Sequence, residues 1–276
     1  MTPTLATGRR RAAGPVVECA HDAPMDWVCA AVWCSNGRNA RAVHDVTAVG
    51  LARYPGPVTT TPATVPGGLF ISLEGGDGVG KSTQSRLLGE WLTGLGLPVV
   101  LTREPGGTDL GRVLREAVLH GDHMDPRTEA LLYAADRAHH VASLVRPALD
   151  AGGVVITDRY LDSSVAYQGT GRDLGAQEVE DLSLWATAGL LPALTVLLDL
   201  DPGIGLSRLS DRDRGPDRLE SAGDDFHRRT REAFLARAAA DPGRWLVLDA
   251  ARTPTEIAAD IRSRVAALLT ARGVAA

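Results

Sequence analysis

The sequence predicts an α/β fold: a doubly wound parallel sheet of about five strands, with helices on both faces. Three observations carry this prediction. From Gly67 onward, short and almost continuous apolar runs alternate with amphipathic stretches. Strands that are apolar on both faces belong in a parallel sheet that helices cover on each side. A glycine-rich loop directly follows the first apolar run, and 44% hydrophobic residues in a chain of 276 suffice for a sizeable core.

The predicted strands are the short apolar runs themselves. In chain order they are residues 69–73, 98–102, 153–157, 194–199 and 245–249. Runs of this length, bounded by glycine, proline or polar residues, are typical of buried strands.

Helices are predicted between these strands from apolar spacing and from start and stop signals. Gly96 and Pro98 end a first run with helical spacing: Leu87, Leu88, Trp91, Leu92 and Leu95. Asp125 and Pro126 supply an N-cap and a first-turn proline for a helix that carries Leu131, Leu132 and Ala135. A capping box at residues 253–256 opens the last helix, whose apolar face is Ile257, Ile261, Val265 and Leu268.

Residues 1–66 differ from the rest of the chain. They are rich in Pro, Thr, Ala and Arg and have no sustained period, so we expect an N-terminal extension that is largely disordered or a wrongly assigned leader. The folded domain is then 67–276. The extension holds a candidate zinc set, Cys19, His21, Cys29, Cys34 and His44, but its spacing matches no common zinc motif.

Composition excludes several classes of protein. No apolar run approaches the ~18 residues that a membrane helix needs. A formal net charge of -5 argues against a general nucleic-acid coat. The basic start at 9–11 is followed only by a short, broken apolar patch, which is a weak targeting signal. We therefore expect a cytoplasmic protein with no nucleic-acid or membrane partner.

The loop after the first strand fits the phosphate-loop pattern G-x4-G-K-[ST] between a strand and a helix. Its predicted ATP-binding residues are Gly75, Gly76, Asp77, Gly78, Val79, Gly80, Lys81, Ser82 and Thr83. Glycines let successive N–H groups point inward as an anion nest, and the following helix adds its positive end. Lys81 is expected to reach the β- and γ-phosphates, and the Ser82 hydroxyl to coordinate Mg²⁺.

Lys81 is the only lysine among 29 basic residues, and this excludes two other phosphate-loop classes. Guanine-specific GTPases carry an N-K-x-D motif, which needs a second lysine. Dimeric ATPase switches begin the loop with an extra lysine, whereas this loop begins at Glu74 and Gly75. The sequence therefore favours a small-molecule kinase.

Further segments narrow the kinase class. T-R-E-P-G-G-T stands at 102–108, L-L-Y-A-A-D-R at 131–137 and D-R-Y-x2-S-S-x-A-Y-Q-G at 158–169. With the phosphate loop, these motifs occur in the order and spacing of bacterial-type thymidylate kinases, which the chain resembles from Gly67 to about Ala276. The resemblance implies a P-loop kinase fold, transfer of phosphate from ATP to dTMP with Mg²⁺, and a homodimer.

Candidate acceptor-site residues follow from these motifs. Ligands of open parallel sheets bind beyond the carboxyl ends of the strands, where Arg103 and Pro105 fall. Arg137 and Arg159 are candidates for the acceptor phosphate, since the guanidinium fork suits phosphate oxygens; the alternative for Arg137 is a surface ion pair. Asp158, at a strand end, is the candidate metal ligand beside Ser82, or else a strand-end cap.

The resemblance adds roles for side chains near the nucleoside. It implies that Asp77 contacts the sugar 3′-hydroxyl and phosphate region of dTMP, and that Tyr167 packs at the 2′ position. Tyr133 stands where the family usually has a phenylalanine stacked on thymine; a core aromatic is the alternative. Ser164 and Gln168 are further candidates for base contacts.

An arginine-rich lid is predicted at about 208–225. Val79 stands where another kinase subtype carries an arginine, so the lid would have to supply that charge. Arg214, with Arg212 or Arg218, is the candidate, and a solvated loop is the alternative. Lys81, Asp158, Arg159 and Arg214 are thus the predicted catalytic residues. Two other functions stay open: a related nucleotide or deoxynucleoside kinase with another acceptor, and a non-catalytic ATP-binding module.

Overall fold

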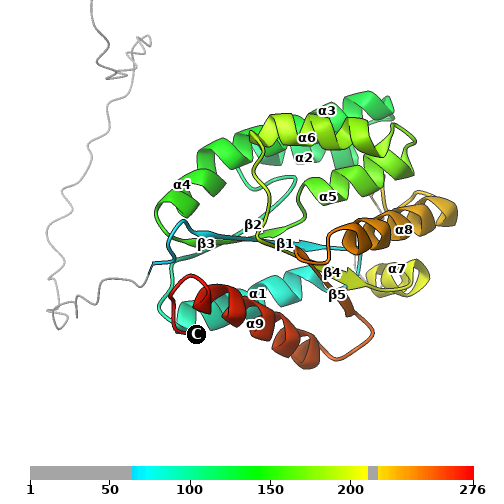
Figure 1. Ribbon diagram of the computed structural model, residues 1–276. Helices are drawn as coiled ribbons and strands as arrows, with labels where there is room; N and C mark the ends of the chain where they lie inside the picture. Colours follow the sequence, from blue (N-terminus) through cyan, green and yellow to red (C-terminus); the bar gives the residue numbers. More distant parts are fainter. Residues whose placement is uncertain (1–63, 211–216) are drawn as a thin grey trace, which may run out of the picture. The chain divides into compact units, whose positions relative to one another are not determined.

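The computed structural model describes residues 64–210 and 217–276 (Figure 1). The candidate zinc set and most of the predicted extension lie outside these ranges. One parallel sheet has the strand order β2-β3-β1-β4-β5, which confirms the predicted fold class. Its strands are β1 (Leu69–Glu74), β2 (Val99–Arg103), β3 (Val154–Asp158), β4 (Leu194–Asp199) and β5 (Trp245–Asp249).

Helices cover both faces of this sheet. In the described part of the chain they are α1 (Lys81–Gly94), α2 (Asp109–His120), α3 (Pro126–His140), α4 (Arg146–Asp150), α5 (Leu161–Ser164), α6 (Ala176–Thr187), α7 (Pro202–Ser210), α8 (Asp224–Ala240) and α9 (Pro254–Thr270). Two π-helical segments, η1 (Val141–Val145) and η2 (Val165–Gly171), continue α3 and α5. Figure 1 shows α1 and α9 together on one face and α3, α4 and α6 on the other. None of the helices described is both long and apolar enough to cross a membrane.

The core lies where the central strands meet the helices. Every residue of β1 is buried, as a strand between two sheet neighbours and two helical layers must be. β2 differs from the prediction of full burial because it is an edge strand, and Leu101 is 50% exposed. The α9 stripe is as predicted except at its end, where Leu269 is fully buried and Leu268 only partly.

Local signals fix the ends of several helices. Asp125 Oδ1 accepts a hydrogen bond from the Arg127 N–H, and Pro126 is the first residue of α3. The capping box of α9 is present: Thr253 Oγ1 accepts from the Glu256 N–H, and the Glu256 carboxylate accepts from the Thr253 N–H.

Val65 extends the folded part of the chain slightly upstream of the predicted boundary. It is fully buried in the main core cluster, and its N–H donates to the carbonyl of Gly152 at 2.8 Å. The start of the domain at Gly67 stays a prediction, but a truncated chain should keep Val65.

Parallel pairing of β1 with β3 and of β3 with β2 brings three carboxyl ends to one edge of the sheet. The phosphate loop follows β1, the 104–108 segment follows β2, and Arg159 follows β3. These segments, which are far apart in the sequence, therefore lie together at the carboxyl edge of the sheet.

Candidate active site

The phosphate loop links the buried β1 to the start of α1, and its backbone needs glycine. Gly78 has φ +74°, and a Cβ there would lie 2.0 Å from the carbonyl oxygen of Gly205. A side chain at this position would collide with α7, so the loop can keep its course only with glycine.

Lys81 is folded back over this loop. Its Nζ donates to the carbonyl oxygens of Gly75 at 3.2 Å and Gly76 at 2.6 Å, and the residue is only 7% exposed. Burial, reinforced by the neighbouring charge of Arg159, lowers the pKa of Lys81. An ammonium held by two carbonyls beside open space can exchange them for phosphate oxygens.

Ser82 and Asp158, the two predicted metal ligands, lie side by side. The Ser82 hydroxyl at the start of α1 donates to Asp158 Oδ2 at the end of β3, with 2.9 Å between the oxygens. A hydroxyl and a carboxylate are the hard oxygen ligands that Mg²⁺ prefers, so these two groups fit that ion.

Arg159 joins the phosphate loop to the segment after β3. Its φ of 71° lies in the left-handed region, which is uncommon for a residue with a side chain and typical of functional sites. The guanidinium donates to the Gly75 carbonyl at 3.0 Å, Asp77 Oδ1 at 2.5 Å, Ser163 Oγ at 3.0 Å and the Tyr167 hydroxyl at 3.2 Å. Sequence reasoning found Arg159 but not this backbone conformation.

Asp77 is the acidic partner of Arg159 in the phosphate loop. Burial alone would raise its pKa, but the charges of Arg159 and Lys81 outweigh burial and lower the pKa to about 2. The carboxylate is therefore ionised at neutral pH. It also accepts a bond from the Tyr167 hydroxyl at 3.3 Å.

An open cavity of about 510 Å³ lies in front of the phosphate loop, and both cationic and acidic side chains line it. Its lining includes Lys81, Ser82, Arg103, Arg115, Asp158 and Arg159. Arg115 was not predicted, because α2 carries no motif around it and only the fold brings it here. Its guanidinium donates to the Pro105 carbonyl at 3.0 Å. The backbone of the phosphate loop and the cationic groups of this lining suit a polyphosphate, and Asp158 beside Ser82 suits its metal ion.

A smaller pocket of about 70 Å³ adjoins this cavity and collects the remaining predicted acceptor residues. Pro105, Tyr133, Arg137, Ser164, Tyr167 and Gln168 all line it. Asp77, Glu104, Arg115 and Arg159 line both the pocket and the larger cavity. The two spaces therefore meet beside the Asp77–Arg159 ion pair.

Arg137 is 2% exposed, which excludes the surface ion pair considered above. Its guanidinium pairs with Glu104 at 2.7 Å and donates to Ser164 Oγ at 3.0 Å, Ser183 Oγ at 3.2 Å and the Tyr160 carbonyl at 3.3 Å. Most of its donors are thus already bonded, and its charge is paired.

Glu104 and His140 support Arg137 from behind, and neither was predicted. Glu104 Oε1 lies 2.8 Å from His140 Nδ1, and His140 Nε2 lies 2.7 Å from the Thr102 hydroxyl. A carboxylate only accepts hydrogen bonds, so Nδ1 carries a proton towards it. The neighbouring Asp136 accepts from the Gly106 N–H at 3.2 Å. Polar residues of α3 thereby fix the segment after β2.

Glu74, the last residue of β1, was also missed. Its carboxyl accepts from the Tyr160 N–H at 2.8 Å and from Ser163 Oγ at 2.5 Å. Burial and the nearby Asp162 raise the pKa of Glu74 to about 8. An acid at the end of an otherwise apolar strand was the available signal.

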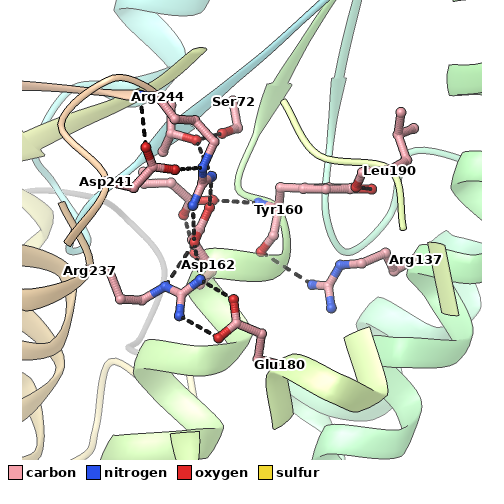
Figure 2. A network of polar contacts seen from close by, with 12 residues as sticks. Ser72, Arg137, Tyr160, Asp162, Glu180, Leu190, Arg237, Asp241 and Arg244 are labelled. Carbon is pink, nitrogen blue, oxygen red and sulfur yellow. Dashed lines mark hydrogen bonds and ion pairs between the residues drawn. The ribbon is translucent and has the colours of Figure 1, made fainter. Parts of the chain in front are cut away.

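Asp162 anchors α5 to distant parts of the chain. Figure 2 shows its carboxylate between Arg237 of α8 and Arg244 before β5, with Glu180 of α6 beside Arg237. Asp162 is fully buried, and both guanidiniums pair with it at 2.7 Å. The next residue, Ser163, contacts Arg159, so this network holds the helix on which the site depends.

The predicted lid is described only in part. Residue 208 belongs to α7, and Arg212 and Arg214 lie outside the described residues. Arg218 donates to the Val118 carbonyl at 2.7 and 3.0 Å and pairs with Glu129. It is therefore attached to α2 and α3.

Comparison with known proteins agrees with this geometry. The family model for thymidylate kinase matches residues 73–261. The thymidylate kinase of Clavibacter michiganensis subsp. michiganensis is 63% identical over 205 residues, covering 74% of this chain and 97% of the relative. That of Leifsonia xyli subsp. xyli is 64% identical over 200 residues, covering 72% and 94%. That of Bifidobacterium longum is 54% identical over 203 residues, covering 72% and 97%.

Proposed function

The chain belongs to the thymidylate kinase family, and from that membership we propose its reaction: ATP + dTMP → ADP + dTDP. The observation that supports it best is the meeting of two spaces at Asp77 and Arg159. One space contains the phosphate loop together with Lys81 and Arg159, and the other is lined by the rings of Tyr133 and Tyr167. Phosphoryl transfer needs a donor phosphate and an acceptor phosphate to meet at such a junction.

On the donor side, the N–H groups of the loop and the positive end of α1 bind the ATP phosphates. Lys81 leaves the Gly76 carbonyl and bonds to the β- and γ-phosphates. Ser82 and Asp158 would hold Mg²⁺, which supplies charge neutralisation for the transferring group. We propose that Arg214, with Arg212 or Arg218, adds lid charge.

On the acceptor side, Tyr133 lies against the base and Tyr167 against the sugar, with Asp77 near the 3′-hydroxyl. Ser164 and Gln168 are the proposed base contacts, and Pro105 completes the wall. We propose that Arg159 holds the acceptor phosphate, assisted by Arg103. Of the two predicted phosphate ligands, Arg137 is the weaker candidate, because its side chain is 2% exposed whereas that of Arg159 is 18% exposed. We propose a single hydrogen bond from Arg137 to the acceptor.

A coupled ADP-release assay tests this function. With ATP and Mg²⁺, dTMP should be a better acceptor than dUMP, dCMP, dGMP or thymidine, and chelation of Mg²⁺ should stop transfer. If thymidine or dGMP were the better acceptor, the proposed reaction would be wrong. Tight nucleotide binding without transfer would instead indicate a non-catalytic module.

We also propose that the protein is a homodimer through the outer face of α2, α3 and α6, helices that lie together in Figure 1. These neighbouring helices carry large exposed apolar side chains: Leu110, Val113, Leu131 and Trp185, the last 82% exposed. Burial of such side chains against a second copy would remove apolar surface from water. Sedimentation velocity should give a dimer, and Trp185→Glu should give a monomer; a monomeric wild type would refute the proposal. The cytoplasmic location and the absence of nucleic-acid and membrane partners stay predictions.

A further inference from the structure

Glu129 lies behind the acceptor pocket, and the proposed reaction gives it no role. It is fully buried on α3, and Tyr133 and Arg137 follow it at helical spacing on the same side of that helix. One carboxylate oxygen accepts a hydrogen bond from Gln168 Nε2 at 2.7 Å. Glu129 is therefore one side chain away from the pocket.

Two arginines hold the charge of Glu129. Arg218 pairs with its carboxylate directly, and Arg172 lies at 3.4 Å from the same oxygen. Both oxygens of this carboxylate accept hydrogen bonds: Oε2 from Arg218 and Arg172, and Oε1 from Gln168 and, at 3.5 Å, from Arg172. All of these partners are donors, so the carboxylate acts here as a hydrogen-bond acceptor.

This fixes the orientation of the Gln168 amide. The NH₂ end must face Glu129, since two acceptors facing each other would repel, and the carbonyl end must then point the other way. Within the described chain, no residue donates a hydrogen bond to Gln168 Oε1. Nor is that oxygen among the fully buried polar atoms without a partner. It therefore faces the pocket that Gln168 lines.

We propose that Glu129 is a positioning residue for base selection, which it exerts by holding the Gln168 carbonyl oxygen towards the acceptor base. This inference rests on the proposed function of the pocket. An acceptor oxygen at that place suits a base whose ring nitrogen carries a hydrogen, as N3 of thymine and uracil does. Cytosine presents an unprotonated N3, which would leave two acceptors opposed. The geometry thus selects dTMP and dUMP over dCMP.

The test is the ratio of kcat/KM for dTMP to kcat/KM for dCMP in the full-length enzyme. Glu129→Gln keeps the shape of the side chain but offers both a donor and an acceptor, so the Gln168 amide can turn over. We expect this ratio to fall about tenfold, which is the effect of mispairing one buried hydrogen bond. The KM for ATP should not change. Arg172→Met is the matched control: it removes a charge partner of Glu129 but keeps the contact to Gln168, and it should leave the ratio unchanged.

A double-mutant cycle separates positioning from general support of the fold. In a Gln168→Met background there is no amide to orient, so adding Glu129→Gln should no longer alter the ratio. A fall in thermal stability with equal losses for dTMP and dCMP would overturn the inference, as would an equal effect of Glu129→Gln with and without Gln168. If Glu129→Gln does not fold, Glu129→Asp withdraws the carboxylate from Gln168 while keeping its charge, and should lower the same ratio. A wild type that phosphorylates neither nucleotide would instead refute the proposed function itself.

Discussion

Lys81 bears the one ammonium among 29 basic residues, and the site explains why an arginine would not serve there. The ammonium sits between two carbonyls of its own loop, where a planar guanidinium is too large and points its donors elsewhere. We expect Lys81→Arg to lower kcat about a hundredfold, the usual loss when one transition-state donor is removed. Steady-state kinetics with dTMP would measure this.

Arg86→Lys is the control for that exchange. Arg86 lies on the same helix in an exposed ion pair with Glu90, where either cation can serve. Its kcat should stay close to that of the wild type. Near-normal turnover by Lys81→Arg would refute the role given to the ammonium.

Asp136 makes stability depend on pH. Burial and the neighbouring Glu104 raise its pKa to about 6, above the ordinary value of 3.8, although Arg137 and His140 oppose the shift. The folded state therefore binds a proton more tightly than the unfolded state. This contribution to stability is complete below about pH 4 and is lost as the pH rises through 6.

Urea unfolding between pH 4 and pH 7 tests this, with Asp136→Asn as reference. The asparagine can still accept from the Gly106 N–H but does not titrate. The free energy of unfolding of the wild type, relative to this variant, should fall over that interval. A constant difference would show that Asp136 titrates normally in the folded state.

Positions at the site were predictable where a local sequence pattern marks them. The phosphate loop and the D-R-Y segment are such patterns, and all predicted residues of the small pocket do line it. Glu104, Glu129 and Arg115 could not be found in this way. Glu104 and Glu129 act through partners 33 and 39 residues away, and Arg115 lies on a helix without a motif, so only the folded chain brings these groups together.

At the scale of single elements, the start of α9 can be tested in isolation. The Glu256 N–H donates a hydrogen bond to Thr253 Oγ1, and the Thr253 N–H donates one to the Glu256 carboxylate. Thr253→Ala removes half of this box and should lower the free energy of unfolding by about 1 kcal/mol. Thr255→Ala, an exposed position of the same helix, should have a much smaller effect. Equal losses in urea unfolding would contradict the capping role.

Strands and helices were predictable because an element that is buried on one or both faces needs apolar residues at regular spacing in the sequence. The exception among strands is β2, whose apolar run resembles the others although it lies at the sheet edge. Strand order is set by long-range pairing, which no single run reveals. The π-helical turn η2 was not predictable either, yet it places both Tyr167 and Gln168 at the pocket.

For the whole molecule, two truncations test where the domain begins. A chain that starts at Thr64 keeps Val65 in the core and should match the full-length enzyme in kcat. A chain that starts at Gly67 loses that side chain and its bond to Gly152, and should be about 2 kcal/mol less stable. Thermal unfolding of both proteins measures the difference. If the chain that starts at Thr64 failed to fold, residues before Thr64 would be needed for folding.

The order of the strands also determines how much of the chain must be synthesised before the fold can be completed. β1, which leads into the phosphate loop, is flanked by β3 and β4, so one of its edges stays unpaired until β4, which ends at Asp199, has emerged. The ion pairs of Asp162 with Arg237 and Arg244 can form only after those later residues have been synthesised. Contacts this distant in sequence form slowly and leave apolar strand edges open in the meantime. The part of the domain that carries the phosphate loop is therefore made early, but its contacts are complete only when the C-terminal third of the chain has been made.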